Sequence, residues 1–455
     1  MARTLTESAR AVRDREVTPS QLVEAALERA DRWQASTNAF TQIRSEDALQ
    51  EARARTADVE GGKPLGPLHG VPVAVKDLFD VAGWETSGSS LSHRGQIARA
   101  DAELVTRLRG AGAVIIGKTN QHELAAGGTN AVSMHGPTRN PWDHTRITGG
   151  SSGGSAAVVA ARVVPMALGT DTGGSIRIPA SFCGVAGLKP SYGLLPSTGM
   201  MPLAPSLDTA GPIAVSVEDL ALSLSALAGT DVMPAADVAG LRIGVAGGFF
   251  ARRTRPEVLS AVEHAGRVLA EAGAEVMPVD VPGLDDAPEA WSVLAMSEFA
   301  AEYGRLLRRP ETLYPLTRTS MSWGASRTAV EYLHAREKAA EVRHRFLDVL
   351  VDVDVILAPA TMLVAPPLGV EEVELAGERM GVHSGAAGWL TRPASLSGLP
   401  ALSLPVGFSP EGLPLGAQVV ARDREEAVLL TVGMAYQART EHHLREPAPR
   451  AARTG

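Results

Sequence analysis

Residues 148–175, TGGSSGGSAAVVAARVVPMALGTDTGGS, hold two Gly/Ser clusters on either side of an apolar run. A Gly/Ser-rich segment is typical of a flexible linker. Here the first cluster continues directly into an apolar stretch with helix-forming residues, and the second, 171–175, precedes another predicted helix. Backbone N–H groups at helix starts favour negative charge. The placement of both clusters therefore indicates active-site loops instead of a linker.

Other glycine-rich motifs fit this stretch less well. A phosphate-binding P-loop requires a lysine after its glycines, and none follows here. The serine-hydrolase pattern G-x-S-x-G matches twice, at 149–153 and 150–154, but it needs a downstream acid and a histidine. No downstream histidine follows a Gly-rich turn after a clear strand, and the S-x-x-K pattern is absent at all lysines. The downstream histidines considered are His264, His334, His344, His383, His442 and His443.

The whole-chain composition predicts a cytoplasmic globular protein. The 455 residues are 45% hydrophobic and 21% charged, with a net charge of −8 that attracts neither nucleic acid nor an anionic membrane. Cys183 is the only cysteine, which excludes a disulfide scaffold. The N-terminus is too charged for a signal peptide, and the longest apolar runs are too short to cross a bilayer.

Helix and strand patterns alternate along the chain. Thr18 and Gln21 form a capping box before an amphipathic helix, and a short apolar strand over 71–75 ends at Lys76. Further helix-then-strand pairs predict an α/β sheet covered by helices on both faces, built as one domain over 1–455. Residues 282–392 are helix-rich and hold three of the six tryptophans. We interpret them as an insertion that forms part of the substrate pocket.

The segment GGSSGGSAAVVAA…LGTDTGGSIRIPASFCGVAGLKPSYG resembles the signature of the amidase signature family, and GVPVAVKD resembles its lysine motif. The likeness is strong over most of 60–230 and extends in outline over the rest of the chain. It implies a single large α/β/α fold with a mixed central sheet. It also implies a Ser–cisSer–Lys triad: Ser175 as nucleophile, Ser151 as the bridging serine after a cis Gly150–Ser151 peptide, and Lys76 as base. The separations, 75 and 24 residues, are those of the family.

The residues themselves agree with this chemistry. A serine hydroxyl is a weak nucleophile until a base takes its proton, and lysine is a base only when burial keeps it neutral. Lys76 ends an apolar strand, as such burial requires. The resemblance further implies an oxyanion hole and supporting polar groups. The oxyanion hole would be the backbone N–H groups of Thr172, Gly173, Gly174 and Ser175; Asp171 and Arg177 would brace the loop, and Ser152 would hydrogen-bond Lys76.

Three functions share these motifs. Stand-alone hydrolysis of small aryl or alkyl amides, and of esters or carbamates, is our main prediction, because the middle of the chain looks like the stand-alone hydrolases. The alternative is the A subunit of glutamyl-tRNA(Gln) amidotransferase, which releases ammonia from glutamine and needs a partner subunit that binds tRNA. A non-catalytic binding module is disfavoured, since all three triad residues are present.

The main prediction sets expectations for substrate and partners. The protein would take a small-molecule substrate as a monomer or homodimer, with no nucleic acid and no membrane. A broad apolar pocket is expected from the tryptophans and methionines near the signature and in 282–392. Its predicted residues are Met200, Met201, Trp323, Met362 and Trp389.

No metal or organic cofactor is expected. His122-Glu123 lacks the second histidine of a zinc helix, and the sequence has no His/Cys cluster. Cys183 follows Phe182 in an apolar context, which is typical of an inert core thiol.

Overall fold

A mixed sheet of eleven strands organises the protein, whose computed structural model describes residues 4–448. The strand order is β1-β3-β2-β4-β6-β5-β12-β13-β9-β7-β8, and a separate hairpin joins β10 to β11. Strand β2 is parallel to β3 and β4, and β7 is parallel to β8 and β9, whereas the other pairs are antiparallel. The strands are β1 (Phe40–Ile43), β2 (Pro72–Lys76), β3 (Val114–Thr119), β4 (Met166–Asp171), β5 (Ala186–Lys189), β6 (Thr209–Ala214), β7 (Arg242–Ala246), β8 (Glu275–Val279), β9 (Val355–Pro359), β10 (Glu372–Leu375), β11 (Glu378–Gly381), β12 (Ala401–Phe408) and β13 (Pro414–Val420).

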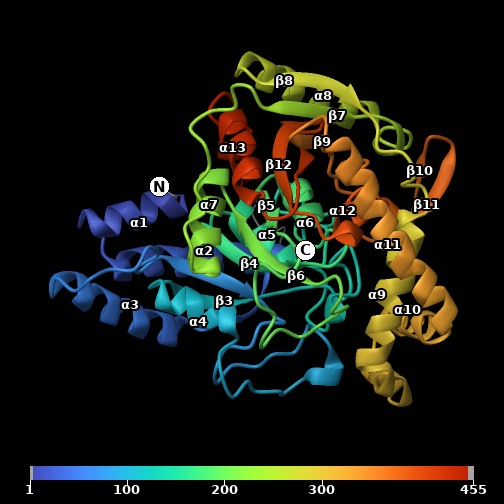
Figure 1. Cartoon of the computed structure of the whole chain (residues 1–455). Helices are drawn as coiled ribbons and strands as arrows, with labels where there is room; N and C mark the ends of the chain where they lie inside the picture. Colours follow the sequence, from blue (N-terminus) through green and yellow to red (C-terminus); the bar gives the residue numbers. More distant parts are fainter. Residues whose placement is uncertain (1–3, 449–455) are drawn as a thin grey trace.

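Helices cover both faces of this sheet (Figure 1). The helices are α1 (Leu5–Arg13), α2 (Pro19–Thr37), α3 (Ser45–Glu60), α4 (Glu103–Gly110), α5 (Gly153–Ala160), α6 (Arg177–Cys183), α7 (Val217–Ala228), α8 (Pro256–Glu271), α9 (Ala287–Tyr303), α10 (Pro315–Ala325), α11 (Ala329–Val349), α12 (Arg392–Ser397) and α13 (Glu426–Gln437). One core cluster contains side chains from α1, α4, α7, α8 and α13, and another contains side chains from α2, α3, α5 and α6. The predicted fold class is confirmed.

Local sequence explains how these elements form. The predicted capping box at Thr18 and Gln21 is present at the start of α2, with Pro19 in its first turn. Alternate residues of β2 reach opposite faces of the sheet: Val73 and Val75 join one core cluster and Ala74 joins the other. Both faces of this strand are therefore buried, which is why its sequence is apolar throughout.

Parallel pairing brings the key segments to one edge of the sheet. Strands β2 and β4 lie side by side with Val75 opposite Leu168, so the carboxyl ends of both strands point the same way. Lys76 ends β2, and Asp171 ends β4 just before the second Gly/Ser cluster. Ligands of open α/β sheets bind at such carboxyl edges. The topology thus brings Lys76 and the two Gly/Ser clusters to the same edge of the sheet.

Helices α9, α10 and α11 stand together at one side of the molecule (Figure 1). They lie within 282–392, but that range also contains β9, which pairs with β13 and β7 inside the main sheet. Helices α9, α10 and α11 therefore account for only part of the range 282–392 that was predicted to be a helix-rich insertion. None of the helices in residues 4–448 is both long enough and apolar enough to cross a membrane.

Candidate active site

Lys76 is fully buried at the end of β2. Its Nζ donates hydrogen bonds to Ser151 Oγ and to Thr170 Oγ1, each at 2.8 Å. Burial lowers the pKa of Lys76 to about 7, although the carboxylates of Asp208 and Asp171 act in the opposite direction. A substantial share of Lys76 is therefore neutral near pH 7, as a base must be. Thr170 was not predicted, because nothing in the sequence around it distinguishes it from an ordinary strand threonine.

The first Gly/Ser cluster holds Ser151 against this lysine. The Gly150–Ser151 peptide bond is cis. A Cβ at Gly150 would lie 2.7 Å from the backbone nitrogen of Asn130, and a Cβ at Gly154 would lie 2.3 Å from the carbonyl of Asn120. The glycines are therefore needed for close backbone approach, not for flexibility.

The predicted hydrogen bond between Ser152 and Lys76 is wrong. Ser152 Oγ instead donates to the carbonyl of Thr170 at 3.0 Å and accepts from its N–H at 3.2 Å. Ser152 thus fastens the first loop to β4, and its backbone N–H also donates to the carbonyl of Ser175 at 3.2 Å. The prediction failed because Thr170, one strand away, occupies the position beside the lysine.

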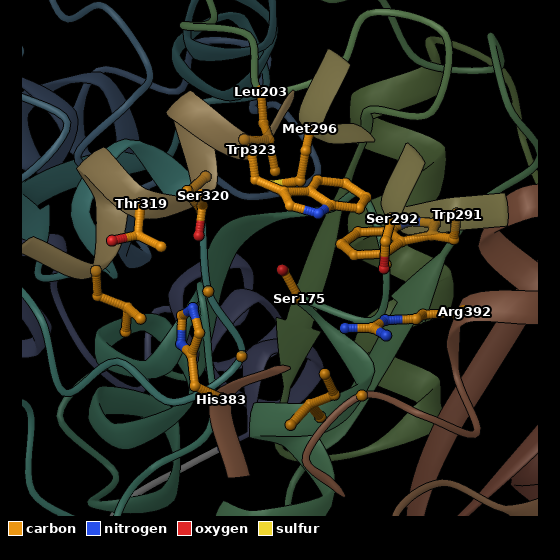
Figure 2. Close-up of a pocket in the computed structure, with 18 residues that line it drawn as sticks. Ser175, Leu203, Trp291, Ser292, Met296, Thr319, Ser320, Trp323, His383 and Arg392 are labelled. Carbon is orange, nitrogen blue, oxygen red and sulfur yellow. The ribbon is translucent and has the colours of Figure 1, made fainter. Parts of the chain in front are cut away.

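Ser175 lies at the end of the second cluster, and its hydroxyl projects into a pocket (Figure 2). Within the described part of the chain, no hydrogen bond joins the hydroxyls of Ser175 and Ser151. The structure therefore brings Lys76 and Ser151 into contact and places Ser175 on the adjoining loop. Ser151 contacts a lysine instead of a histidine, unlike the serine of a G-x-S-x-G elbow.

A buried ion pair braces the second cluster. Arg177 Nη2 lies 3.0 Å from Asp171 Oδ1, and both side chains are inaccessible to solvent. Burial alone would raise the pKa of Asp171, but the charge and hydrogen bond of Arg177, the charge of Lys189 and the N–H of Gly174 together outweigh burial and lower this pKa to about 2. The carboxylate also accepts the N–H of Gly174 at 2.7 Å. This N–H, predicted as an oxyanion donor, is therefore already engaged, which leaves Thr172, Gly173 and Ser175 as candidate donors.

Residues distant in sequence form hydrogen bonds to the backbone of the second cluster, whose N–H groups were predicted to form the oxyanion hole. Trp291 Nε1 donates to the carbonyl of Thr172, and Thr391 Oγ1 donates to the carbonyl of Gly173, both at 2.7 Å. A Cβ on Gly173 would lie 2.4 Å from the Trp291 ring, so only glycine fits there. Thr172 Oγ1 also donates to Asp208 Oδ1 at 2.6 Å, and burial raises the pKa of Asp208 to about 6. None of these three supporting residues was predicted, because their contacts depend on tertiary packing.

The pocket beside Ser175 has a volume of about 350 Å³ and mainly apolar walls. Trp323 lines it, as predicted. The residues that line it are Ala125, Ala126, Gly127, Gly128, Gly173, Ser175, Ile178, Leu203, Trp291, Ser292, Met296, Leu316, Thr319, Ser320, Trp323, His383, Gly388 and Arg392.

The other four predicted pocket residues lie elsewhere. Met362 is buried in the core, and Trp389 stacks on Phe249 with Arg253 over its ring. Met200 and Met201 pack as partly buried residues against the main core cluster. Composition alone did not separate core methionines and tryptophans from pocket ones, because both environments are apolar.

The pocket wall carries a neutral imidazole, that of His383. The rings of His383 and His122 contact each other at a tilt of 32°, with centroids 5.0 Å apart. Burial, with the charge of Arg392, lowers the pKa of His383 to about 4. Burial also raises the pKa of the Cys183 thiol, which is fully enclosed. Among residues 4–448, no three His, Cys, Asp or Glu side chains converge in the way a metal site requires.

Fold and site define an enzyme that acts on amide C–N bonds. A family model described as Amidase matches residues 21–430, and the chain belongs to the amidase signature family. The A subunit of glutamyl-tRNA(Gln) amidotransferase from Chromohalobacter salexigens is 36% identical, and the match covers 98% of each chain. The crystal structure of an amidase is 40% identical, covers 96% of this chain and 100% of its own, and has a TM-score of 0.91. The corresponding A subunit from Thermotoga maritima is 29% identical over 99% of this chain and 98% of its own, with a TM-score of 0.80.

These comparisons correct the main functional prediction. A stand-alone amidase was predicted from the middle of the chain, yet the amidotransferase protein of Chromohalobacter salexigens matches along almost the whole length, that segment included. The prediction of a stand-alone enzyme is therefore wrong, and its alternative is better supported. The triad residues could not distinguish a stand-alone amidase from an amidotransferase A subunit, since both classes share them.

Proposed function

We propose that this protein is the glutamine-hydrolysing subunit of an amidotransferase of the glutamyl-tRNA(Gln) type. The observation that carries the proposal is the 36% identity to the A subunit of such an enzyme over 98% of both chains. The pocket supports it by placing a cation, Arg392, near Ser175, where an amino-acid substrate presents a carboxylate (Figure 2).

The chemistry follows from the contacts of the three side chains. Ser175 Oγ attacks the side-chain carbonyl carbon of glutamine, while its proton passes through the hydroxyl of Ser151 to neutral Lys76. The hydrogen bond between the two serines forms as substrate enters, because catalytic contacts commonly tighten only then. Backbone N–H groups of the 172–175 loop stabilise the developing oxyanion.

Product release completes the cycle. Protonated Lys76 returns its proton through Ser151 to the leaving nitrogen, so ammonia departs and a glutamyl ester remains on Ser175. Water then attacks this ester and its proton passes to Lys76. As the C–O bond to Ser175 breaks, Lys76 returns this proton through Ser151 to Ser175 Oγ and becomes neutral again. Glutamate and the free serine hydroxyl result, and atoms and protons balance over the two steps.

An amidotransferase of this type needs a partner subunit that binds tRNA, whereas the sequence had led us to expect no nucleic acid. We expect tRNA to contact such an assembly mainly through a partner subunit, because the net charge of −8 on this chain does not attract nucleic acid. The ammonia would be consumed there by an activated glutamyl group on tRNA. A monomer or homodimer without nucleic acid is then not the working form.

Ammonia release tests the proposal. The purified chain is assayed with glutamine alone, and with glutamyl-tRNA(Gln) plus the remaining components of an amidotransferase whose glutamine-hydrolysing protein is similar to this chain. We expect glutamate and ammonia to form, and the rate to rise when the other components and tRNA are added. Absence of glutamine hydrolysis in every combination, from a folded protein that fluorophosphonates still label, would overturn the proposal.

A further inference from the structure

We propose that Asp208 is a positioning residue for the reaction at Ser175. Its carboxylate links the oxyanion loop (residues 172–175) to the pocket wall at Leu203, and its charge stabilises the protonated form of Lys76. The inference rests on the proposed function only in using Ser175 as the nucleophile. It applies to any amide that Ser175 attacks.

The register of the sheet places Asp208 beside the oxyanion loop. Thr172 directly follows β4, and Asp208 directly precedes β6. These strands pair antiparallel with Asp171 opposite Thr209, so Thr172 and Asp208 leave the ladder at the same end. Thr172 Oγ1 donates to Asp208 Oδ1 at 2.6 Å. The first residue of the oxyanion loop is therefore held by a carboxylate from the neighbouring strand.

The second oxygen of the same carboxylate holds the pocket wall. Asp208 Oδ2 accepts the backbone N–H groups of Leu203 and Ala204 at 2.8 and 3.0 Å. Leu203 lines the pocket into which the Ser175 hydroxyl projects (Figure 2). The position of the wall relative to the oxyanion loop thus depends on Asp208, and small errors in such positions are costly for catalysis.

The charge of Asp208 acts on Lys76. Burial lowers the pKa of Lys76, and the carboxylates of Asp208 and, to a smaller extent, Asp171 oppose this effect. Asp171 is paired with the guanidinium of Arg177 at 3.0 Å, whereas the printed partners of Asp208 are neutral: a hydroxyl and two backbone N–H groups. The negative charge of Asp208 therefore favours the ammonium form of Lys76.

Other titratable groups around this pair leave that effect in place. Burial lowers the pKa of His122 well below its ordinary value, so His122 adds no positive charge near pH 7. Burial raises the pKa of Tyr192 and Tyr303, and the charge of Asp208 adds to this effect, so both phenols stay protonated. Burial raises the pKa of Asp208 itself to about 6, and this carboxylate is therefore charged at the pH where Lys76 titrates.

The pH profile of Ser175 labelling by a fluorophosphonate tests the charge. Asp208→Asn keeps the shape of the side chain but removes its charge, so the midpoint of the rise in labelling rate should move about one pH unit lower. Asp219→Asn is the matched control. Asp219 is another buried carboxylate whose pKa burial raises to about 6, but it accepts from Thr6 and does not line the pocket. Its midpoint should equal that of the wild type.

A double-mutant cycle at about pH 9, where Lys76 is neutral, tests the link to the oxyanion loop. Thr172→Val and Asp208→Ala should each lower the labelling rate about tenfold, because the oxyanion donors lose their fixed position. The double variant should be no slower than Asp208→Ala alone, since both changes remove the same contact. Thr172→Ser, which keeps a hydroxyl, should lose less than Thr172→Val.

Circular dichroism establishes that each variant is folded. An unchanged midpoint in Asp208→Asn, an equal shift in Asp219→Asn, or equal rates for Thr172→Val and Thr172→Ser would overturn the inference. Should the Asp208 variants not fold, the comparison of the two Thr172 variants decides. If the variants behave as expected while the wild type never hydrolyses glutamine, the inference stands and the proposed function fails.

Discussion

Lys76 Nζ lies 2.8 Å from Ser151 Oγ, although 75 residues separate the two in the chain. The contact exists because Lys76 ends a buried strand, β2, and Ser151 precedes α5, which packs against β2 and β4. Enclosure of the ammonium group lowers the pKa of Lys76 to about 7, as the proposed role of a base requires. If the proposed mechanism holds, this pair and its surroundings set the rate of the reaction and its dependence on pH.

The pH dependence of turnover should report Lys76. Below pH 7 the lysine is protonated and accepts no proton, so kcat/KM should rise with pH through about 7 and level off above it. Lys76→Ala should lower kcat/KM about 10²–10⁴-fold and remove this acid limb. Initial rates between pH 5.5 and 9 measure both effects.

Lys189 provides a matched control for this profile. Lys189 is also fully buried, and burial together with the charge of Arg177 lowers its pKa to about 7. Its Nζ donates to the carbonyl of Pro190 and does not line the pocket. Lys189→Met should keep the acid limb. If the limb vanished in Lys189→Met but persisted in Lys76→Ala, Lys76 would not be the base.

Thr170 should tune the same lysine. Thr170→Val removes a hydroxyl that accepts from Lys76 Nζ and so destabilises the protonated form. The midpoint of the acid limb should therefore move to lower pH. Thr119→Val is the control, because Thr119 is a buried strand threonine whose hydroxyl pairs with Ser155 instead. An unchanged midpoint in Thr170→Val would contradict the assigned contact.

Trp291 should affect the rate through the oxyanion loop. Trp291→Phe keeps an aromatic ring but removes the hydrogen bond to the carbonyl of Thr172. We expect kcat to fall about tenfold, since misplaced oxyanion donors lose transition-state stabilisation. Trp389→Phe, outside the pocket lining, should change kcat little. Equal effects of the two substitutions would argue against a specific role for Trp291.

The ion pair between Asp171 and Arg177 should dominate local stability. Asp171→Asn leaves the guanidinium of Arg177 buried without its charge partner, which costs about 3–5 kcal/mol in free energy of unfolding. Urea denaturation followed by circular dichroism measures the loss. A change below about 1 kcal/mol would show that the pair contributes little.

Sequence alone predicted the parts of this site that local patterns encode. The mixed sheet, the capped α2 helix and the apolar strand before Lys76 follow from periodicity and from resemblance. Apart from Trp323, the residues of the pocket wall could not be predicted, because Trp291, His383 and Arg392 come close to Ser175 only through packing of distant segments. Ser152 was misassigned for the same reason, since it precedes α5 and its partner Thr170 lies on β4.

Covalent trapping tests the central claim most directly, namely that Ser175 is the nucleophile that Ser151 and Lys76 activate. The protein is treated with a fluorophosphonate, digested, and the labelled residue identified by mass spectrometry. We predict a label on Ser175 in the wild type, slower labelling of Ser175 in Ser151→Ala, and no label in Ser175→Ala. A label on Ser151 or Ser152 in the wild type would contradict the account and restore the G-x-S-x-G alternative.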